Sequence, residues 1–522
     1  MGENCRNVLR GIIGMKVNQL KAGAFLSYFS LLLSNVITLL YTPFMMNTMG
    51  QSQYGLYAAV FNVAGFLGIL DFGFGNAIVR YTVSFKSQGR IDKVYSLFGM
   101  FLILYSLIGL LAFGAGLGLY FNVTSFFEKS LTLQEIEEAR IMIFLMILNV
   151  AVSFPLGVFG SIIIAYENFV FQKVVNIIRI VLQPCIMIPL LLMGYKAVAM
   201  VVVFTVLNIF CLFLNCWYCF FRLHIRFYFK KLEWGLTREI VNYSFFVFIG
   251  IIVDKIYWGS GNFVMASIAG ATVAAVYAIV MQLTNYYMNF SLAVSGVFLP
   301  KLTKMVTQKQ SDSEISDLFV KLGRIQYLVM ALILSGFVLF GKSFIYLWVG
   351  PGFKDAYLIG LIILIPLTIP LIQNLGITIL QARNQQKFRS LVYIVIALLS
   401  LAISIPLAKE YGGVGYALGT SFALIVGNIF VMNIYYYKKI HLNIPFFWKE
   451  IIRMTFPIVL VAIVSAFLSN LYGEDNWFSL GVKILLYILS YGIVVWKFVM
   501  NPYERNLFWS PVQKVFYRYR RS

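Results

Sequence analysis

The sequence predicts an all-α polytopic membrane protein with about fourteen transmembrane helices, and three observations support this prediction. Of the 522 residues, 61% are hydrophobic and only 12% are charged, and the mean hydropathy of +0.85 is far above that of soluble domains. Apolar runs of about 20 residues, the length that crosses a bilayer, follow one another along the chain. Basic residues gather in alternate connections between these runs, as in multi-pass proteins with positive cytoplasmic loops.

The apolar runs give the predicted helices in chain order. The first six lie at residues 22–43, 53–72, 94–120, 139–165, 171–193 and 197–220. Six more lie at residues 242–268, 272–299, 325–348, 355–380, 390–408 and 414–436, and two last ones at 452–472 and 478–500. We therefore expect a six-helix lobe over residues 1–241, a second over 242–451, two additional helices within 452–500 and a basic cytoplasmic tail over 501–522.

The basic residues predict the orientation of these helices. They precede the first helix and follow the second, sixth, eighth, tenth and twelfth, so both termini are expected in the cytoplasm. The formal net charge of +21 follows this alternation, which excludes a nucleic-acid groove. Residues 1–21 carry basic residues but no apolar core ending in a cleavage site, so removal of a signal peptide is not expected. The five cysteines and two histidines lack metal-ligand spacing, so neither a metal nor a disulfide is expected.

An internal repeat relates the two groups of six helices. A shift of 220 residues aligns residues 208–210 with 428–430, both Asn-Ile-Phe, and also aligns Gly50 with Gly270. The same shift aligns Asn35 with Lys255, and a shift of 217 aligns Phe171 with Phe388. Because six is an even number, the repeats are expected to run parallel, related by a pseudo-two-fold axis along the membrane normal with a cavity between them.

Two charged residues interrupt the predicted helix at residues 242–268. Lys255 and its neighbour Asp254 lie near its middle, about 20 Å from either end at 1.5 Å per residue. A charge at that depth costs at least a few kcal/mol unless it faces a polar cavity or a partner, so it predicts a functional site. Polar or aromatic residues at helical spacing accompany it on this helix and the next: Trp258, Asn262, Gln282, Asn285 and Tyr286. The two helices are therefore expected to share a hydrophilic cavity.

Residues 50–57 (GQSQYGLY) and 70–81 (LDFGFGNAIVRY) resemble bacterial polysaccharide-biosynthesis membrane proteins. These are the Wzx-type oligosaccharide flippases of the MOP (multidrug, oligosaccharidyl-lipid, polysaccharide) superfamily. The resemblance implies two six-helix lobes that move undecaprenyl-diphosphate-linked oligosaccharide across the bacterial cytoplasmic membrane by alternating access, for O-antigen, capsule or exopolysaccharide synthesis. It implies a transporter rather than an enzyme, without a cofactor, and leaves open coupling to a proton or sodium gradient.

Other consequences of the resemblance concern lipids and partners. Membrane lipids are expected partners, and a polysaccharide polymerase and a chain-length regulator would accompany this function. The similar lipid II flippases also have fourteen helices, the last two associated with a lipid groove, which implies a lipid-tail groove at residues 452–500. Those flippases carry a cavity arginine in the first helix, whereas residues 22–43 are uncharged. This difference argues against lipid II as the substrate.

The residues expected to carry function each have an alternative interpretation. A cation in the cavity can offset the charge of a diphosphate, and Lys255 is the leading candidate, the alternative being a structural partner of a carboxylate. Asp254 is either a coupling carboxylate or a partner of another helix. Asn35 and Arg179 join the substrate-binding set, although snorkelling to the cytoplasmic interface is the simpler interpretation of Arg179. Asp71 and Arg80 flank glycines and form either a conformational hinge or a plain helix end.

Two rival functions differ in features that the sequence displays. A MATE-like, cation-coupled multidrug exporter has the same architecture but would favour an acidic cavity for cationic substrates. A membrane glycosyltransferase or polymerase would carry a large external loop with catalytic residues. The longest external loop here, near residues 123–138, is short and its acidic cluster is more simply a solvated helix start.

Overall fold

The computed structural model of the chain describes residues 19–72, 74–128, 131–229, 248, 251–253, 255–308, 310–383, 385–471 and 476–506. These residues form helices and connections, without a strand among them. Ten of the described helices are long and apolar enough to cross a membrane. The chain divides into two compact units, Met1–Lys255 and Ile256–Ser522. The all-α polytopic architecture predicted from the sequence is confirmed, and the described spans are consistent with fourteen crossings.

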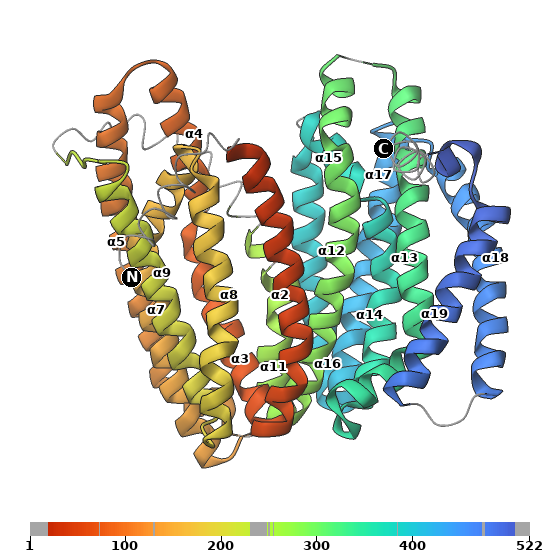
Figure 1. The fold of residues 1–522 in the computed structure, drawn as a ribbon, viewed down its shortest axis with the longest axis horizontal. Helices are drawn as coiled ribbons and strands as arrows, with labels where there is room; N and C mark the ends of the chain where they lie inside the picture. Colours follow the sequence, from red (N-terminus) through yellow and green to blue (C-terminus); the bar gives the residue numbers. More distant parts are fainter. Residues whose placement is uncertain are drawn as a thin grey trace, which may run out of the picture. The chain divides into compact units, whose positions relative to one another are not determined.

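Six long helices of the first unit match the six predicted spans (Figure 1). They are α2 (Gln19–Met49), α3 (Gln51–Leu67), α5 (Ile91–Phe121), α7 (Leu133–Ala165), α8 (Phe169–Leu192) and α9 (Ala197–Phe221). Helix α7 packs against both α5 and α9, and α8 packs against α2. Large aromatic side chains such as Phe98 and Phe101 fill the core between α4, α5 and α7.

Three short elements connect these helices, and the sequence prediction missed them: η1 (Gly68–Asp71), α4 (Phe74–Ser87) and α6 (Val123–Phe127). Helix α4 buries Phe74, Ala77, Ile78 and Tyr81, which recur at helical spacing, and leaves Arg80 exposed. This pattern is that of an amphipathic helix, and a search for uninterrupted apolar runs does not find it. Similarly, α7 begins six residues before the predicted position 139 because Thr132 and Glu135 form a capping box.

The second unit begins within the π-helical turn η2, and nine further helical segments precede the last pair of spans. Its elements are η2 (Lys255–Gly259), α11 (Ser260–Ile268), α12 (Ala271–Thr307), α13 (Asp312–Val349), η3 (Pro351–Phe353), α14 (Asp355–Ile372), α15 (Asn374–Ala382), α16 (Gln386–Leu424), η4 (Ile425–Val431), α17 (Met432–Lys438), α18 (Ile444–Leu471), α19 (Trp477–Val494) and η5 (Val495–Val499). The predicted division at residue 241 falls in residues 230–247, outside the described part.

Helix α16 contains the turn between the predicted spans at residues 390–408 and 414–436. The helical run is interrupted at Gly412, which has φ 56° and ψ −135°. Beyond this turn the chain returns against itself so closely that a Cβ atom on Gly415 would lie 2.0 Å from the Leu407 carbonyl oxygen. A glycine is therefore required at position 415, because no side chain fits between the two backbones.

The two units repeat several local geometries at the positions that the sequence shifts align. Gly50 and Gly270, both with positive φ, precede α3 and α12. Phe171 stacks on Tyr218 with ring centroids 3.8 Å apart, and Phe388 stacks on Tyr435 at 4.0 Å. His224 and His441, also 217 residues apart, both have positive φ after the sixth helix of each group. These matches indicate that the two units share one folding pattern.

Helices α18 and α19 pack on α13 in the second unit (Figure 1). Their shared apolar seam includes Phe340 of α13, Met454 of α18 and Tyr487 of α19. The Tyr491 hydroxyl of α19 donates to the Leu328 carbonyl of α13 at 2.7 Å. The last two helices are therefore an integral part of this unit.

Candidate functional site

Lys255 opens the π-helical turn η2, which is followed by α11. Its side chain is exposed. A Cβ atom on Gly65 of α3 would lie 3.2 Å from the Lys255 Nζ, so the ammonium reaches the α3 backbone at a residue that lacks a side chain. π-Helical turns often mark functional sites, because the extra residue displaces a helix face. Asp254, its predicted neighbour in the site, lies outside the described residues.

Trp258 and Asn262 belong to the same segment but to a more enclosed environment. Trp258 is half-buried, packs against the apolar core of the second unit and meets the Tyr257 ring edge-to-face at 4.7 Å. Asn262 is only 8% exposed, and its Oδ1 has no hydrogen-bond donor among the described residues. The π-helical turn shifts the residues after Lys255 from their α-helical spacing. This shift explains why the exposure of the side chains differs so strongly among the residues predicted to share one helix face.

Helix α12 carries the remaining predicted polar side chains. Asn285 is exposed, and the Gln282 amide donates to the Tyr286 hydroxyl at 2.8 Å. The neighbouring Tyr287 points into the core instead, where its hydroxyl lies 2.7 Å from the Thr368 hydroxyl. Within the second unit α12 therefore has one buried face and one open polar face. Hydrocarbon cannot solvate an open asparagine at membrane depth, so this face is suited to water or to a hydrophilic ligand.

Arg179 lies inside a polar network formed by three helices of the first unit. Its guanidinium donates to Asn208 of α9 at 3.0 Å and to Asn176 of α8 at 3.1 Å. The Asn208 amide donates in turn to Asn149 and Ser153 of α7, at 3.1 and 2.9 Å. Because α8 begins at Phe169, Arg179 lies about 15 Å along the helix axis from its start. Arg179 therefore bonds directly to α9 and is linked to α7 through Asn208.

Asn35, Asp71 and Arg80 lie elsewhere in the first unit. Asn35 is half-buried on α2. Asp71 ends the 3₁₀ turn η1 and accepts a hydrogen bond from the Tyr105 hydroxyl of α5 at 2.7 Å. Arg80 is exposed on α4, with its guanidinium 5.8 Å from the Tyr81 ring centroid. Asp71 therefore fixes the end of α3 on α5, next to Phe72, whose φ of 52° marks a local bend.

Sequence reasoning missed the asparagines that surround Arg179. Asn149 is 4% exposed in the middle of an apolar span, and its Nδ2 has no acceptor among the described residues. The sequence did contain a signal for Asn208, because the repeat aligns it with Asn428. In the structure, each of these two asparagines accepts a hydrogen bond from the preceding helix of its unit. The donor to Asn428 is the hydroxyl of Tyr393, which a shift of 217 aligns with Asn176.

Neither Lys255 nor Arg179 has an ion-pair partner within the described part of the chain. The ion pairs found there join Arg324 to Glu450 and Glu504, and Arg383 to Asp312. Lys255 and Arg179 take part in none of them. Both cations belong to the first unit, and Arg179 lies in the candidate membrane span Phe169–Leu192.

Comparison with known proteins connects this arrangement with polysaccharide export. The sequence profile of the family described as "Polysaccharide biosynthesis protein" matches residues 20–306, more than half of the chain. A Shigella flexneri protein described as "Putative O-antigen transporter" is 20% identical over 402 residues, covering 75% of this chain and 92% of that protein.

Solved structures with the same fold belong to two kinds of transporter. The lipid II flippase MurJ in its inward closed conformation has a TM-score of 0.69 at 16% identity, over 94% of this chain and 99% of that one. An inward-facing multidrug resistance MATE family transporter of the MOP superfamily has a TM-score of 0.57 at 14% identity, over 77% and 99%. At these identities the likeness concerns the fold.

Proposed function

The chain belongs to the polysaccharide biosynthesis protein family, and from this premise we propose that it is a flippase for undecaprenyl-diphosphate-linked oligosaccharide repeat units. The membrane is the bacterial cytoplasmic membrane, and the product serves surface polysaccharide synthesis. The protein acts as a transporter by alternating access and makes or breaks no covalent bond in the glycan.

The observation that carries this proposal is a pair of cations of the first unit, Lys255 and Arg179, without an ion-pair partner among the described residues. A diphosphate crossing the membrane needs a positive charge along its path, and a lysine or arginine supplies it. Lys255 is accessible, and Arg179 is held by amides that orient it without cancelling its charge. The open polar face of α12, with Asn285, suits the hydroxyl-rich glycan.

A groove on the second unit supports the expectation that residues 452–500 hold the lipid tail. It has a volume of about 460 Å³ and is walled mainly by apolar side chains of α18, α19 and Phe340 of α13. Such a groove fits an isoprenoid chain that stays within the bilayer while the sugar moves, since isoprenoid and groove are both apolar. Lys483 of α19 is its charged lining residue.

The test follows the lipid-linked sugar in a strain that lacks the gene, using leaflet-selective labelling. We expect the sugar to accumulate in the cytoplasmic leaflet, and wild type to restore it to the outer leaflet. Lys255→Ala should insert normally but fail to restore it, whereas Lys439→Ala, an exposed cation after α17, should restore it fully. Unchanged sugar distribution together with new drug sensitivity would refute the flippase and favour the exporter.

A further inference from the structure

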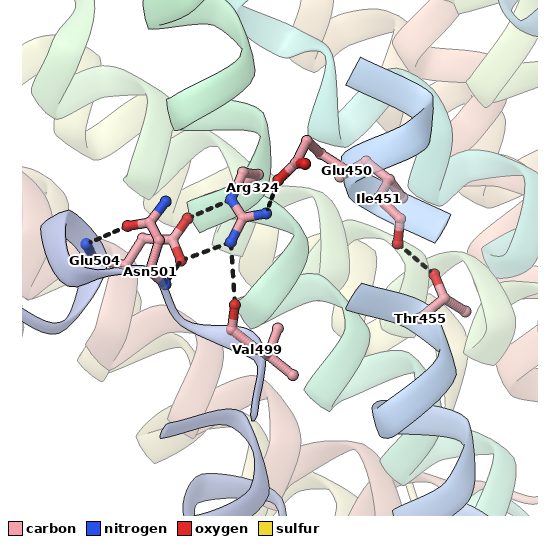
Figure 2. A network of polar contacts seen from close by, with 7 residues as sticks. All are labelled: Arg324, Glu450, Ile451, Thr455, Val499, Asn501 and Glu504. Atoms are coloured by element: carbon pink, nitrogen blue, oxygen red, sulfur yellow. Dashed lines mark hydrogen bonds and ion pairs between the residues drawn. The ribbon is translucent and has the colours of Figure 1, made fainter. Parts of the chain in front are cut away.

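A buried cluster of three charged side chains ties together the helices that wall the apolar groove (Figure 2). Arg324 of α13 is 5% exposed and contacts Glu450 of α18 and Glu504, which follows η5. Figure 2 shows the two carboxylates on opposite sides of the guanidinium. The Asn501 backbone amide also donates to Glu504 Oε2 at 2.9 Å. The cluster therefore holds α18 and the segment after α19 against α13 at one level of the unit.

The groove lies away from this cluster along the same helices. Phe340 follows Arg324 by 16 residues on α13, which is about 24 Å at 1.5 Å per residue. Leu460 follows Glu450 by ten residues on α18, about 15 Å. The basic loops predict that the cluster end of these helices faces the cytoplasm. The groove therefore extends from near the middle of the helices toward the predicted outer side.

The walls of the groove on α18 and α19 are almost entirely apolar. Ser465 and Ser469 lie one turn apart on α18, and Ser490 lines the groove from α19, so short side chains leave space between the helices. The hydroxyls of Ser469 and Ser490 each donate to a carbonyl of their own helix at 2.9 Å. Apart from the serines and Lys483, the lining residues are aliphatic or aromatic. These walls suit a hydrocarbon chain.

Lys483 adds a cation to this apolar groove. It shares the groove face of α19 with Tyr487 and Ser490, at spacings of four and seven residues. It follows Trp477, where α19 begins, by six residues, about 9 Å along the axis. Helical side chains lean toward the N-terminus, so the ammonium is directed to this end of the helix. The exposed ring of Trp477 marks the same end, as tryptophan does at a membrane interface.

The predicted topology gives no reason for a lysine at this place. Basic residues are expected to gather on the cytoplasmic side, whereas Lys483 lies toward the predicted outer end of the candidate span Trp477–Val499. An apolar groove that carries one cation is complementary to a lipid with an anionic headgroup. The walls contact the hydrocarbon, and the ammonium binds a phosphate as a point charge. One narrow groove of about 460 Å³ suits a lipid with a single chain better than a glycerophospholipid with two.

We propose that Lys483 and the groove bind the carrier lipid by both of its parts, with the diphosphate at the ammonium and the isoprenoid chain between α18 and α19. The identity of this lipid rests on the proposed flippase function. The site belongs to the second unit, whereas Lys255 and Arg179 belong to the first. It adds a headgroup contact on the predicted outer side to a groove that otherwise offers only hydrocarbon contacts.

The test is photocrosslinking in nanodiscs of zwitterionic phosphatidylcholine. The probe is undecaprenyl diphosphate with a diazirine in the isoprenoid unit next to the diphosphate, and mass spectrometry identifies the crosslinked peptides. In wild type we expect crosslinks within residues 460–494. Lys483→Gln should lower their yield about tenfold, because the phosphate loses a charge-assisted contact, and Lys483→Arg should keep it. Lys342→Gln, an exposed cation of α13 outside the groove lining, is the matched control and should crosslink as wild type.

Equal yields from wild type and Lys483→Gln would overturn the proposal, as would an equal yield from a probe with a hydroxyl in place of the diphosphate. Phosphatidylglycerol that competes as well as unlabelled undecaprenyl diphosphate would assign the site to any anionic lipid and overturn the choice of carrier lipid. If Lys483→Gln does not insert, Ser465→Phe supplies the test, because it fills the groove and keeps the charge. We expect it to lower the yield, and a wild-type yield would overturn the proposal.

The crosslinking assay follows binding without transport, which separates this inference from the flippase function. A chain that crosslinks as expected but does not restore the sugar to the outer leaflet would refute the flippase function alone. A chain that restores the sugar but crosslinks equally with and without Lys483 would overturn the lipid site alone.

Discussion

At the scale of single residues, Arg179 illustrates how a cation remains charged inside a membrane protein. Amide oxygens of Asn176 and Asn208 accept its hydrogen bonds. Amides compensate part of the lost hydration but carry no opposite charge, so the guanidinium still attracts an anion. Asn149 and Ser153 hold Asn208 in turn, which fixes the position of the cation between three helices.

Arg179→Gln is expected to remove this charge and retain the asparagine network. Hydrogen bonds to charged groups contribute about 1.5–3 kcal/mol, so delivery of the lipid-linked glycan to the outer leaflet should fall by about tenfold or more. The measurement is leaflet-selective sugar labelling at equal protein level. Lys173→Gln, nearer the start of the same helix, is the matched control and should export normally. Normal export by Arg179→Gln would remove Arg179 from the substrate path.

Arg324→Gln tests the strength of the buried cluster. The substitution leaves the carboxylates of Glu450 and Glu504 together without their cation, a change that typically costs about 3–5 kcal/mol in a buried pair. Thermal unfolding in detergent should therefore occur at a clearly lower temperature than in wild type. Asp317→Asn, at the exposed surface of the same helix, should shift stability by less than about 0.5 kcal/mol. Equal melting of the two variants would mean that the cluster contributes little.

At the scale of elements, the chain uses glycines where helices turn or approach closely. The apolar runs predicted the spans well, because a membrane-crossing helix must be long and apolar whatever surrounds it. They did not predict α4 or the early start of α7, since amphipathic helices and capping boxes depend on polar residues. The predicted spans at residues 390–408 and 414–436 require a turn between them, and the structure has one at Gly412.

Gly415→Ala is expected to disrupt the return of α16 upon itself. The added Cβ would meet the Leu407 carbonyl group, which is backbone and cannot rotate away. Overpacking of this kind costs about 1–3 kcal/mol. Gly114→Ala is the matched control, because a Cβ there meets no neighbour within 4 Å and α5 should gain about 0.5–1 kcal/mol. Thermal unfolding of both variants checks the difference, and equal stability would contradict the close approach.

At the scale of the whole molecule, charge outside the membrane sets the predicted topology. Basic residues in alternate loops predict that both termini lie in the cytoplasm and that the connection near Lys196 lies outside. Residues near Lys439, after α17, are expected inside. The repeated geometries of the two units agree with an even number of helices in each group, since only then do both groups begin on the same side.

Single cysteines in a chain without native ones test this topology. Lys196→Cys should react with a membrane-impermeant maleimide in intact cells, because its loop is predicted to lie outside. Lys439→Cys should react only after the membrane is opened. Labelling of Lys439→Cys in intact cells would reverse the predicted orientation.

The sequence by itself determined the membrane class, the spans and the repeat, because hydrophobic length, loop charge and residue spacing are local properties. It also pointed to Lys255, a charge in an apolar run. Only the tertiary structure decided which side chains contact one another. Examples are the asparagines around Arg179, the different surroundings of Lys255 and Asn262, and the burial of Glu504 against Arg324. These depend on contacts between helices distant in sequence, and hydropathy carries no information about such contacts.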